Sequence, residues 1–235
     1  MVYLLNAAHW FGSAVCHQFP EHSYWVAGVP LPLCARCTGL YLGALLTLIF
    51  HAWRRPRAVG LPRPWMVVAL VLFFFAWAGD GLNSFLSMTE VTLVIPSVPH
   101  LYPPQNLLRL ITGTLMGITI GSLVFVMFNS LVWRAPNPDS IFATRREFFA
   151  LLGLGALLVF VVHSEFAPLL YPLNLAILIA ILVLHTTLVT AFIANLTRPA
   201  LNWRQALPAF AFGALIALLY LSAIALLRAI LLPVL

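Results

Sequence analysis

Three cysteines and two histidines gather in one polar stretch near the N-terminus, VCHQFPEHSYWVAGVPLPLCARCTG. Cys34 and Cys37 form a Cys-x-x-Cys pair, and the adjacent residues Cys16 and His17 precede it. Three thiolates and one imidazole make a closed tetrahedral ligand set that suits zinc, and a Cys-x-x-Cys turn supplies two of those ligands. The spacing therefore predicts a metal centre, with zinc as the metal, at these four residues. His22 is an alternative fourth ligand.

Thiol chemistry is an alternative interpretation of the same cysteines. Outside the cytoplasm cysteines are commonly oxidised, and a Cys-x-x-Cys pair can be a redox-active dithiol. Cys37 is expected in the first turn of a helix, where the positive end of the helix dipole favours a thiolate. Cys16 would then be the exchanging third thiol. One structural disulfide with a cysteine left over is a further alternative, so metal ligation is favoured while both thiol interpretations stay open.

A second group of polar residues falls within or beside apolar segments. Ionisable residues inside membrane spans are costly and are candidates for function. Asp80 and Arg109 are expected at matched depth on consecutive spans, and we predict an ion pair between them and tentative catalytic roles. Asn83, Asn106 and Thr112 surround the pair and, with Arg109, are candidate substrate-binding residues. Because an arginine can meet a phosphate or carboxylate, a pocket here would suit a lipid or an anionic small molecule.

The composition decides which elements must position these groups. The chain is 63% hydrophobic and 8% charged, and its mean hydropathy is +1.02. A soluble protein of this length would expose far more apolar surface than water tolerates, so lipid must solvate the chain. The apolar runs are continuous and lack the alternation of barrel strands, which favours helices. The sequence thus predicts an all-α, polytopic membrane helix bundle.

Six apolar runs are each long enough to cross a hydrocarbon layer of about 30 Å. A polar segment, 1–34, precedes them, and residues 35–235 would form the six-helix part of a single domain. The first fifteen residues are too short to span and are expected to form an interfacial helix resting against the bundle. The predicted spans are 35–53, 65–85, 107–133, 147–165, 172–195 and 207–231.

The arginines predict the orientation. All twelve basic residues are arginine, and most of them lie in the linkers 54–63, 134–146 and 198–204. Short basic linkers of this kind are typical of the cytoplasmic side of a membrane. We therefore expect a multi-pass protein of the cell (inner) membrane with the cysteine segment outside. No nucleic-acid-reading motif accompanies the arginines, so nucleic acid is not an expected partner.

Small residues predict how the spans pack. Gly113, Gly117 and Gly121 recur in steps of four along the third span, and Gly39 and Gly43 do so in the first. Ridges of this kind let helix backbones approach closely in lipid. Packing within the bundle is the expected use, and an oligomer face is the alternative.

At these residues the sequence resembles an uncharacterised family of bacterial and archaeal integral membrane proteins with a CHQ…CARCTG signature. The similarity covers roughly residues 16–121. His22 stands where the family pattern leads us to expect an arginine, which favours His17 as the fourth ligand. The resemblance implies no activity. The residues that match the signature are Cys16, His17, Gln18, Pro20, Ser23, Cys34, Arg36, Cys37, Thr38, Gly39, Asp80, Asn106, Arg109 and Gly113.

Three classes of function follow from these residues. The leading hypothesis is a membrane protein with an extracytoplasmic zinc centre above a polar pocket at Asp80 and Arg109, acting on or binding a lipid-like or anionic substrate. A membrane thiol–disulfide oxidoreductase linked to quinone, using Cys34 and Cys37, is the second. A transporter, or a structural subunit clamped by a metal or a disulfide, is the third. The sequence does not decide whether the protein is an enzyme.

Overall fold

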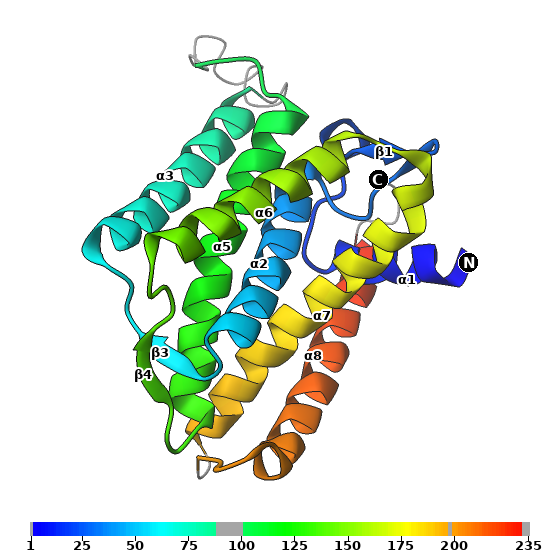
Figure 1. Cartoon of the computed structure of the whole chain (residues 1–235). Coiled ribbons are helices and arrows are strands. Elements are labelled where there is room, and N and C mark those ends of the chain that lie inside the picture. Colours follow the sequence, from blue (N-terminus) through cyan, green and yellow to red (C-terminus); the bar gives the residue numbers. More distant parts are fainter. Residues whose placement is uncertain (1, 88–100, 197–198, 232–235) are drawn as a thin grey trace.

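The computed structural model describes residues 2–87, 101–196 and 199–231. Six helices in these residues are long and apolar enough to cross a membrane, and they pack as one bundle (Figure 1). The prediction of an all-α, multi-pass membrane bundle is confirmed. The helices are α2 (Ala35–Arg54), α3 (Pro64–Leu86), α5 (Asn106–Val132), α6 (Arg145–His163), α7 (Leu170–Asn195) and α8 (Trp203–Leu231).

The helix bounds lie within a few residues of the predicted spans. At the start of α6 the N-cap Thr144 accepts a hydrogen bond from the backbone N–H of Glu147, which is half of a capping box. Helix α8 begins at Trp203, ahead of the predicted start, and contains Pro208. Pro208 lies past the first four residues, whose N–H groups have no partner within the helix, so it removes one backbone hydrogen bond, the one to the Arg204 carbonyl.

Helices α2 and α5 form the centre of the bundle, and their glycines face one another. A Cβ atom added at Gly39 would lie 2.4 Å from the Leu110 carbonyl oxygen, and one at Gly113 would lie 2.1 Å from that of Arg36. Gly43, Gly117 and Gly121 are equally close to the partner helix. Both seams are therefore buried inside one chain, and the alternative use of these glycine faces in an oligomer is wrong.

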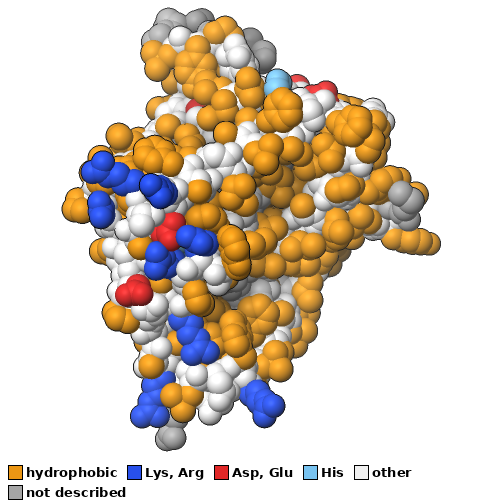
Figure 2. Space-filling view, viewed as in Figure 1, with side chains coloured by type: hydrophobic (Ala, Val, Ile, Leu, Met, Phe, Trp, Pro, Cys, Tyr) orange, Lys and Arg blue, Asp and Glu red, His pale blue; other side chains and the backbone are white. Residues whose placement is uncertain are grey.

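The arginine-bearing linkers meet at one end of the bundle. Strand β3 (Ala58–Gly60), in the first linker, pairs in parallel with β4 (Asn137–Ser140), in the second. The third linker joins them through a hydrogen bond from the Arg134 backbone N–H to the Ala200 carbonyl. Figure 2 shows basic side chains gathered at this end and apolar side chains over most of the remaining visible surface. Arg198, counted in the third linker, lies outside the described residues.

The N-terminal segment covers the opposite end of the bundle. It contains α1 (Val2–Ser13), the 3-10 helix η1 (Pro20–His22) and a hairpin of β1 (Trp25–Val26) and β2 (Val29–Pro30). The hairpin turn has positive φ at Ala27 and Gly28, as a type I′ turn requires. Helix α1 rests against α7 and α8, which agrees with the expected helix against the bundle. A second 3-10 helix, η2 (Ala167–Leu169), leads into α7.

Candidate metal centre and adjoining polar pocket

The three cysteines converge at the start of α2. All three are free, and the thiols of Cys34 and Cys37 both hydrogen-bond to the Cys16 sulfur. The sulfurs of Cys16 and Cys34 and a ring nitrogen of His17 lie within 4.8 Å of one another. Cys34 is the N-cap of α2 and Cys37 lies in its first turn, so the Cys-x-x-Cys pair brackets the helix start. The tertiary fold thus brings together the four residues predicted as ligands.

The surroundings of Cys16 favour a thiolate. Hydrogen bonds from the Cys34 and Cys37 thiols lower the pKa of Cys16 far below its ordinary value. The backbone N–H groups of Cys34 and Gln18 also donate to its sulfur, at 3.2 and 3.4 Å. Gln18 adopts a left-handed φ of 59° in this turn. Thiolate sulfur is the form that binds a metal ion, so the cluster is suited to a soft cation.

The two histidines beside the cluster are neutral at pH 7. Burial lowers the pKa of His17, and it lowers the pKa of His22 to about 4 with a further contribution from the Arg109 charge. The two rings are joined by a hydrogen bond of 3.3 Å between His17 Nε2 and His22 Nδ1. A neutral imidazole is the form that ligates metals. His17 is itself a member of the cluster. His22 lies outside the cluster and hydrogen-bonds to the His17 ring.

Two side chains, Gln18 within the turn and the distant Arg228, hold the turn that carries Cys16 and His17. The Gln18 amide donates to the His9 and Pro32 carbonyls at 3.0 and 2.9 Å. Arg228, in the last turn of α8, donates to the carbonyl oxygens of Ser13, Cys16 and His17. Sequence reasoning missed Arg228, although a lone arginine in an apolar run is itself a sign of a functional or structural site.

Asp80 forms its ion pair with Arg36, and the predicted pair with Arg109 is wrong. The Asp80 carboxylate accepts from Nε of Arg36 at 3.0 Å and also from Nη2. Arg36 stands in the first turn of α2, directly across from Asp80 on α3. The prediction matched the depths of two helices correctly but overlooked the arginine within the Cys-x-x-Cys motif. Asp80 also accepts from the Tyr102 hydroxyl at 2.9 Å.

Arg109 is buried without a carboxylate partner. It is 6% exposed, and its guanidinium donates to Asn106 Oδ1 at 2.9 Å. Among the described residues no acidic side chain forms an ion pair with it. A cavity of about 230 Å³ opens beside it. The lining residues are His17, His22, Cys34, Arg36, Gly81, Ser84, Phe85 and Arg109.

The remaining predicted pocket residues surround this cavity without lining it. Asn83 is buried and bonds to the backbone of Leu101 and Tyr102. Asn106 donates to the Glu21 and Ser23 carbonyls. The hydroxyl of Thr112 donates within α5 and weakly to Asp80. These side chains position the N-terminal segment, the loop before α5 and the ion pair, while Arg109 is the member of the predicted set that faces the cavity.

These features define a multi-pass membrane protein with a Cys/His cluster at one end of its helix bundle. Residues 16–123 match the model of a family described as "Predicted membrane protein (DUF2085)". The match confirms the resemblance to an uncharacterised family of membrane proteins. The matched segment contains the cluster and every residue that lines the cavity, and it ends before α6.

Two archaeal proteins are similar to the same part of the chain. An uncharacterised protein of Methanocaldococcus jannaschii is 27% identical over 124 residues, which is 52% of this chain and 69% of that protein. An uncharacterised protein of Methanothermobacter thermautotrophicus is 29% identical over 113 residues, which is 48% of this chain and 86% of that protein. No solved structure matches the chain.

Proposed function

We propose that the protein binds one zinc ion through Cys16, His17, Cys34 and Cys37. The observation that carries the proposal is the convergence of the Cys16 and Cys34 sulfurs and a His17 nitrogen within 4.8 Å, with Cys37 hydrogen-bonded to both sulfurs. When bound, the ion would supply a four-coordinate cross-link between the N-terminal segment and α2. Four protein ligands favour a structural centre, since metal-assisted catalysis needs an open coordination position.

The polar pocket beside this centre binds the phosphate or carboxylate head group of a lipid-like or anionic molecule. Arg109 supplies a buried positive charge with which no carboxylate of the described residues forms an ion pair. Arg36 is already paired with Asp80, and the pKa values of both histidines are lowered, so Arg109 is the cationic side chain of the lining that has no ion pair within the described residues. A cavity of about 230 Å³ accommodates a head group while the rest of a lipid would extend away from it.

The proposed orientation follows from the arginine end of the bundle. The linkers that carry the arginines contact one another at the end opposite the cysteine cluster. With those linkers in the cytoplasm of the cell membrane, residues 1–34 and the polar pocket face the outside. A thiol reagent that cannot cross the membrane tests on which side Cys16 lies. Zinc is first stripped from intact cells, and we expect the reagent to label Cys16 in them. Labelling only after the cells are opened would invert the orientation.

Elemental analysis of purified protein tests the metal centre. We expect about one zinc per chain, lost in Cys34→Ser and in His17→Gln. His163→Gln is the control, because His163 hydrogen-bonds to Tyr24 at the same end of the bundle and stands outside the cluster. Circular dichroism in detergent checks that each variant keeps its helices. Wild-type protein without metal, or full zinc content in Cys34→Ser, would contradict the proposal.

Ligand-induced thermal stabilisation tests the pocket. Dodecyl phosphate should raise the unfolding temperature of the wild-type protein, and Arg109→Gln should abolish the shift. Arg63→Gln, at the opposite end of the bundle, is the control arginine. Inorganic phosphate shows whether the head group alone suffices. If Arg109 only balances the charge of a zinc–thiolate centre, Arg109→Gln will lower zinc affinity and leave the response to dodecyl phosphate unchanged.

A thiol–disulfide oxidoreductase is the second candidate, favoured by the contact among three free thiols. In that function Cys34 and Cys37 would form a disulfide by giving up two electrons and two protons, which reduce a quinone to a quinol. Cys16 would attack the disulfide in exchange with a partner thiol. Purified protein that lacks metal, contains an oxidised Cys34–Cys37 pair and reduces that pair only when a quinol is supplied would support this alternative over the zinc centre and over a structural disulfide.

A further inference from the structure

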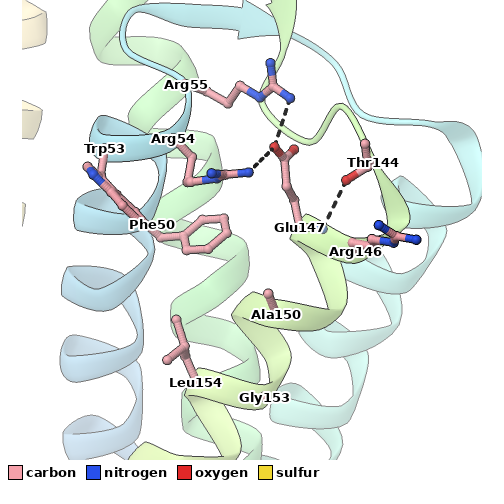
Figure 3. A pocket seen from close by; sticks show the side chains of 10 residues that line it. All are labelled: Phe50, Trp53, Arg54, Arg55, Thr144, Arg146, Glu147, Ala150, Gly153 and Leu154. Atoms are coloured by element: carbon pink, nitrogen blue, oxygen red, sulfur yellow. Dashed lines mark hydrogen bonds and ion pairs between the residues drawn. The ribbon is translucent and has the colours of Figure 1, made fainter.

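A large groove between α2 and α6 lies at the arginine end of the bundle, away from the cysteine cluster. It has a volume of about 760 Å³. Figure 3 shows Arg54 and Arg55 turned toward Glu147 at one end of it, Arg146 directed away from them on α6, and apolar side chains continuing along the two helices. The residues that line this α2–α6 groove are Phe50, Trp53, Arg54, Arg55, Thr144, Arg146, Glu147, Ala150, Gly153 and Leu154.

The polar end of the α2–α6 groove carries excess positive charge. Arg54 and Arg55 share one carboxylate, because both donate to Oε1 of Glu147, at 3.3 and 2.8 Å. The side chain of Arg146 forms no ion pair or side-chain hydrogen bond with another described residue. Three arginines against one glutamate leave two positive charges (3 − 1 = 2). The first turn of α6 lies beside them and adds the positive end of its dipole.

This group contains one donor without a partner and one accessible guanidinium. Nε of Arg55 is buried and has no hydrogen-bond partner. The side chain of Arg54 is 47% exposed, so the charged group remains accessible from the groove. Guanidinium groups bind phosphate oxygens through paired N–H donors. The polar end therefore matches a phosphate group.

The rest of the α2–α6 groove is apolar and open. Trp53 is 77% exposed, and Leu154 is also exposed, although both lie on helices of the bundle. A Cβ atom added at Gly153 would contact nothing within 4 Å. In a membrane helix bundle, such an open apolar surface below a cluster of arginines faces acyl chains, not water.

We propose that the α2–α6 groove binds an anionic phospholipid, with its phosphate at Arg54 and Arg55, the charge of Arg146 nearby on α6, and an acyl chain along Ala150, Gly153 and Leu154. Basic pockets between membrane helices bind anionic head groups in this way. The lipid would bridge α2 to α6, which otherwise meet at this end through the ion pairs of Glu147. This site is independent of the zinc centre and of the pocket at Arg109.

Native mass spectrometry of the full-length protein in detergent tests the proposal, with phosphatidylglycerol and phosphatidylcholine of identical chains as probes. Phosphatidylglycerol should bind more tightly. Arg146→Gln should weaken its binding about fivefold, which corresponds to one basic residue near an anionic lipid. Gly153→Leu should also weaken it, because the new side chain fills the path of the acyl chain. Neither substitution removes an interaction within the described residues.

Matched variants separate this site from general effects. Arg63→Gln removes an arginine from the same end outside the groove, and Gly79→Leu fills a glycine position on α3 that is equally open; both should bind phosphatidylglycerol like the wild type. Equal binding of the two lipids would overturn the proposal, as would equal effects of Gly153→Leu and Gly79→Leu. Full competition by millimolar inorganic phosphate would indicate a soluble anion and would likewise overturn it.

Discussion

Replacing Arg228 by methionine should weaken zinc binding although the residue lies on the last transmembrane helix. Its guanidinium donates hydrogen bonds to the carbonyls of Ser13, Cys16 and His17, including one of 2.9 Å to Ser13 and one of 2.6 Å to His17. At about 1 kcal/mol net for each bond, the three contribute about 3 kcal/mol to the geometry of this turn. Arg228 is half-buried, so water replaces part of that loss. We expect zinc affinity to fall about tenfold to a hundredfold, as for other residues that support metal ligands.

Competition with a chromophoric zinc chelator measures this loss directly. Arg228→Lys should lie between the wild type and Arg228→Met, because an ammonium keeps the charge but cannot direct a planar fork of donors at three carbonyls. Arg204→Met, at the other end of α8, is the control and should bind zinc normally. Wild-type affinity in Arg228→Met, with intact helices, would show that the turn is held without α8 and would refute the reasoning.

Three further predictions concern stability and the metal. Asp80→Ala leaves the Arg36 guanidinium without its carboxylate and should lower the free energy of unfolding by about 3 kcal/mol. Denaturant titration in detergent measures this change, and an unchanged midpoint would mean that the ion pair contributes nothing to stability. Gly117→Val places a side chain against the backbone of α2 and should cost about 1–3 kcal/mol or more, whereas Gly79→Val should cost little. Removing zinc with a chelator should expose residues 14–34 to protease while the helical content stays constant; equal cleavage with and without zinc would contradict a structural centre.

The spans were predictable because their information is local. Long apolar runs have one stable state in lipid, and tryptophans, prolines and arginines mark their ends. The glycine steps on α2 and α5 also predicted close packing. That the glycines of α2 and α5 pack against each other within one chain became clear only from the positions of Gly39 and Gly113 against the opposite backbone.

The convergence of the candidate ligands was predictable for a different reason. Cysteine and histidine have few uses in an apolar protein, so their spacing pointed to Cys16, His17, Cys34 and Cys37 before any fold was known. The partner of Asp80 was not predictable in the same way. Two arginines, Arg36 and Arg109, lie at suitable depths, and the rotation of each helix about its axis decides which one faces the carboxylate.

The amino-acid sequence by itself determined the membrane class, the number of spans, the shared end of the arginine linkers and the identity of the candidate ligands. Each of these properties depends on composition or on the spacing of residues close together in the sequence. None of them depends on which distant residues come into contact when the chain folds. The tertiary structure alone decided that Arg36 holds Asp80, that Arg109 is left without a carboxylate, and that Arg228 supports the turn at Cys16. Those contacts join residues far apart in the chain, and only the packing angles and rotations of the helices bring them within hydrogen-bonding distance.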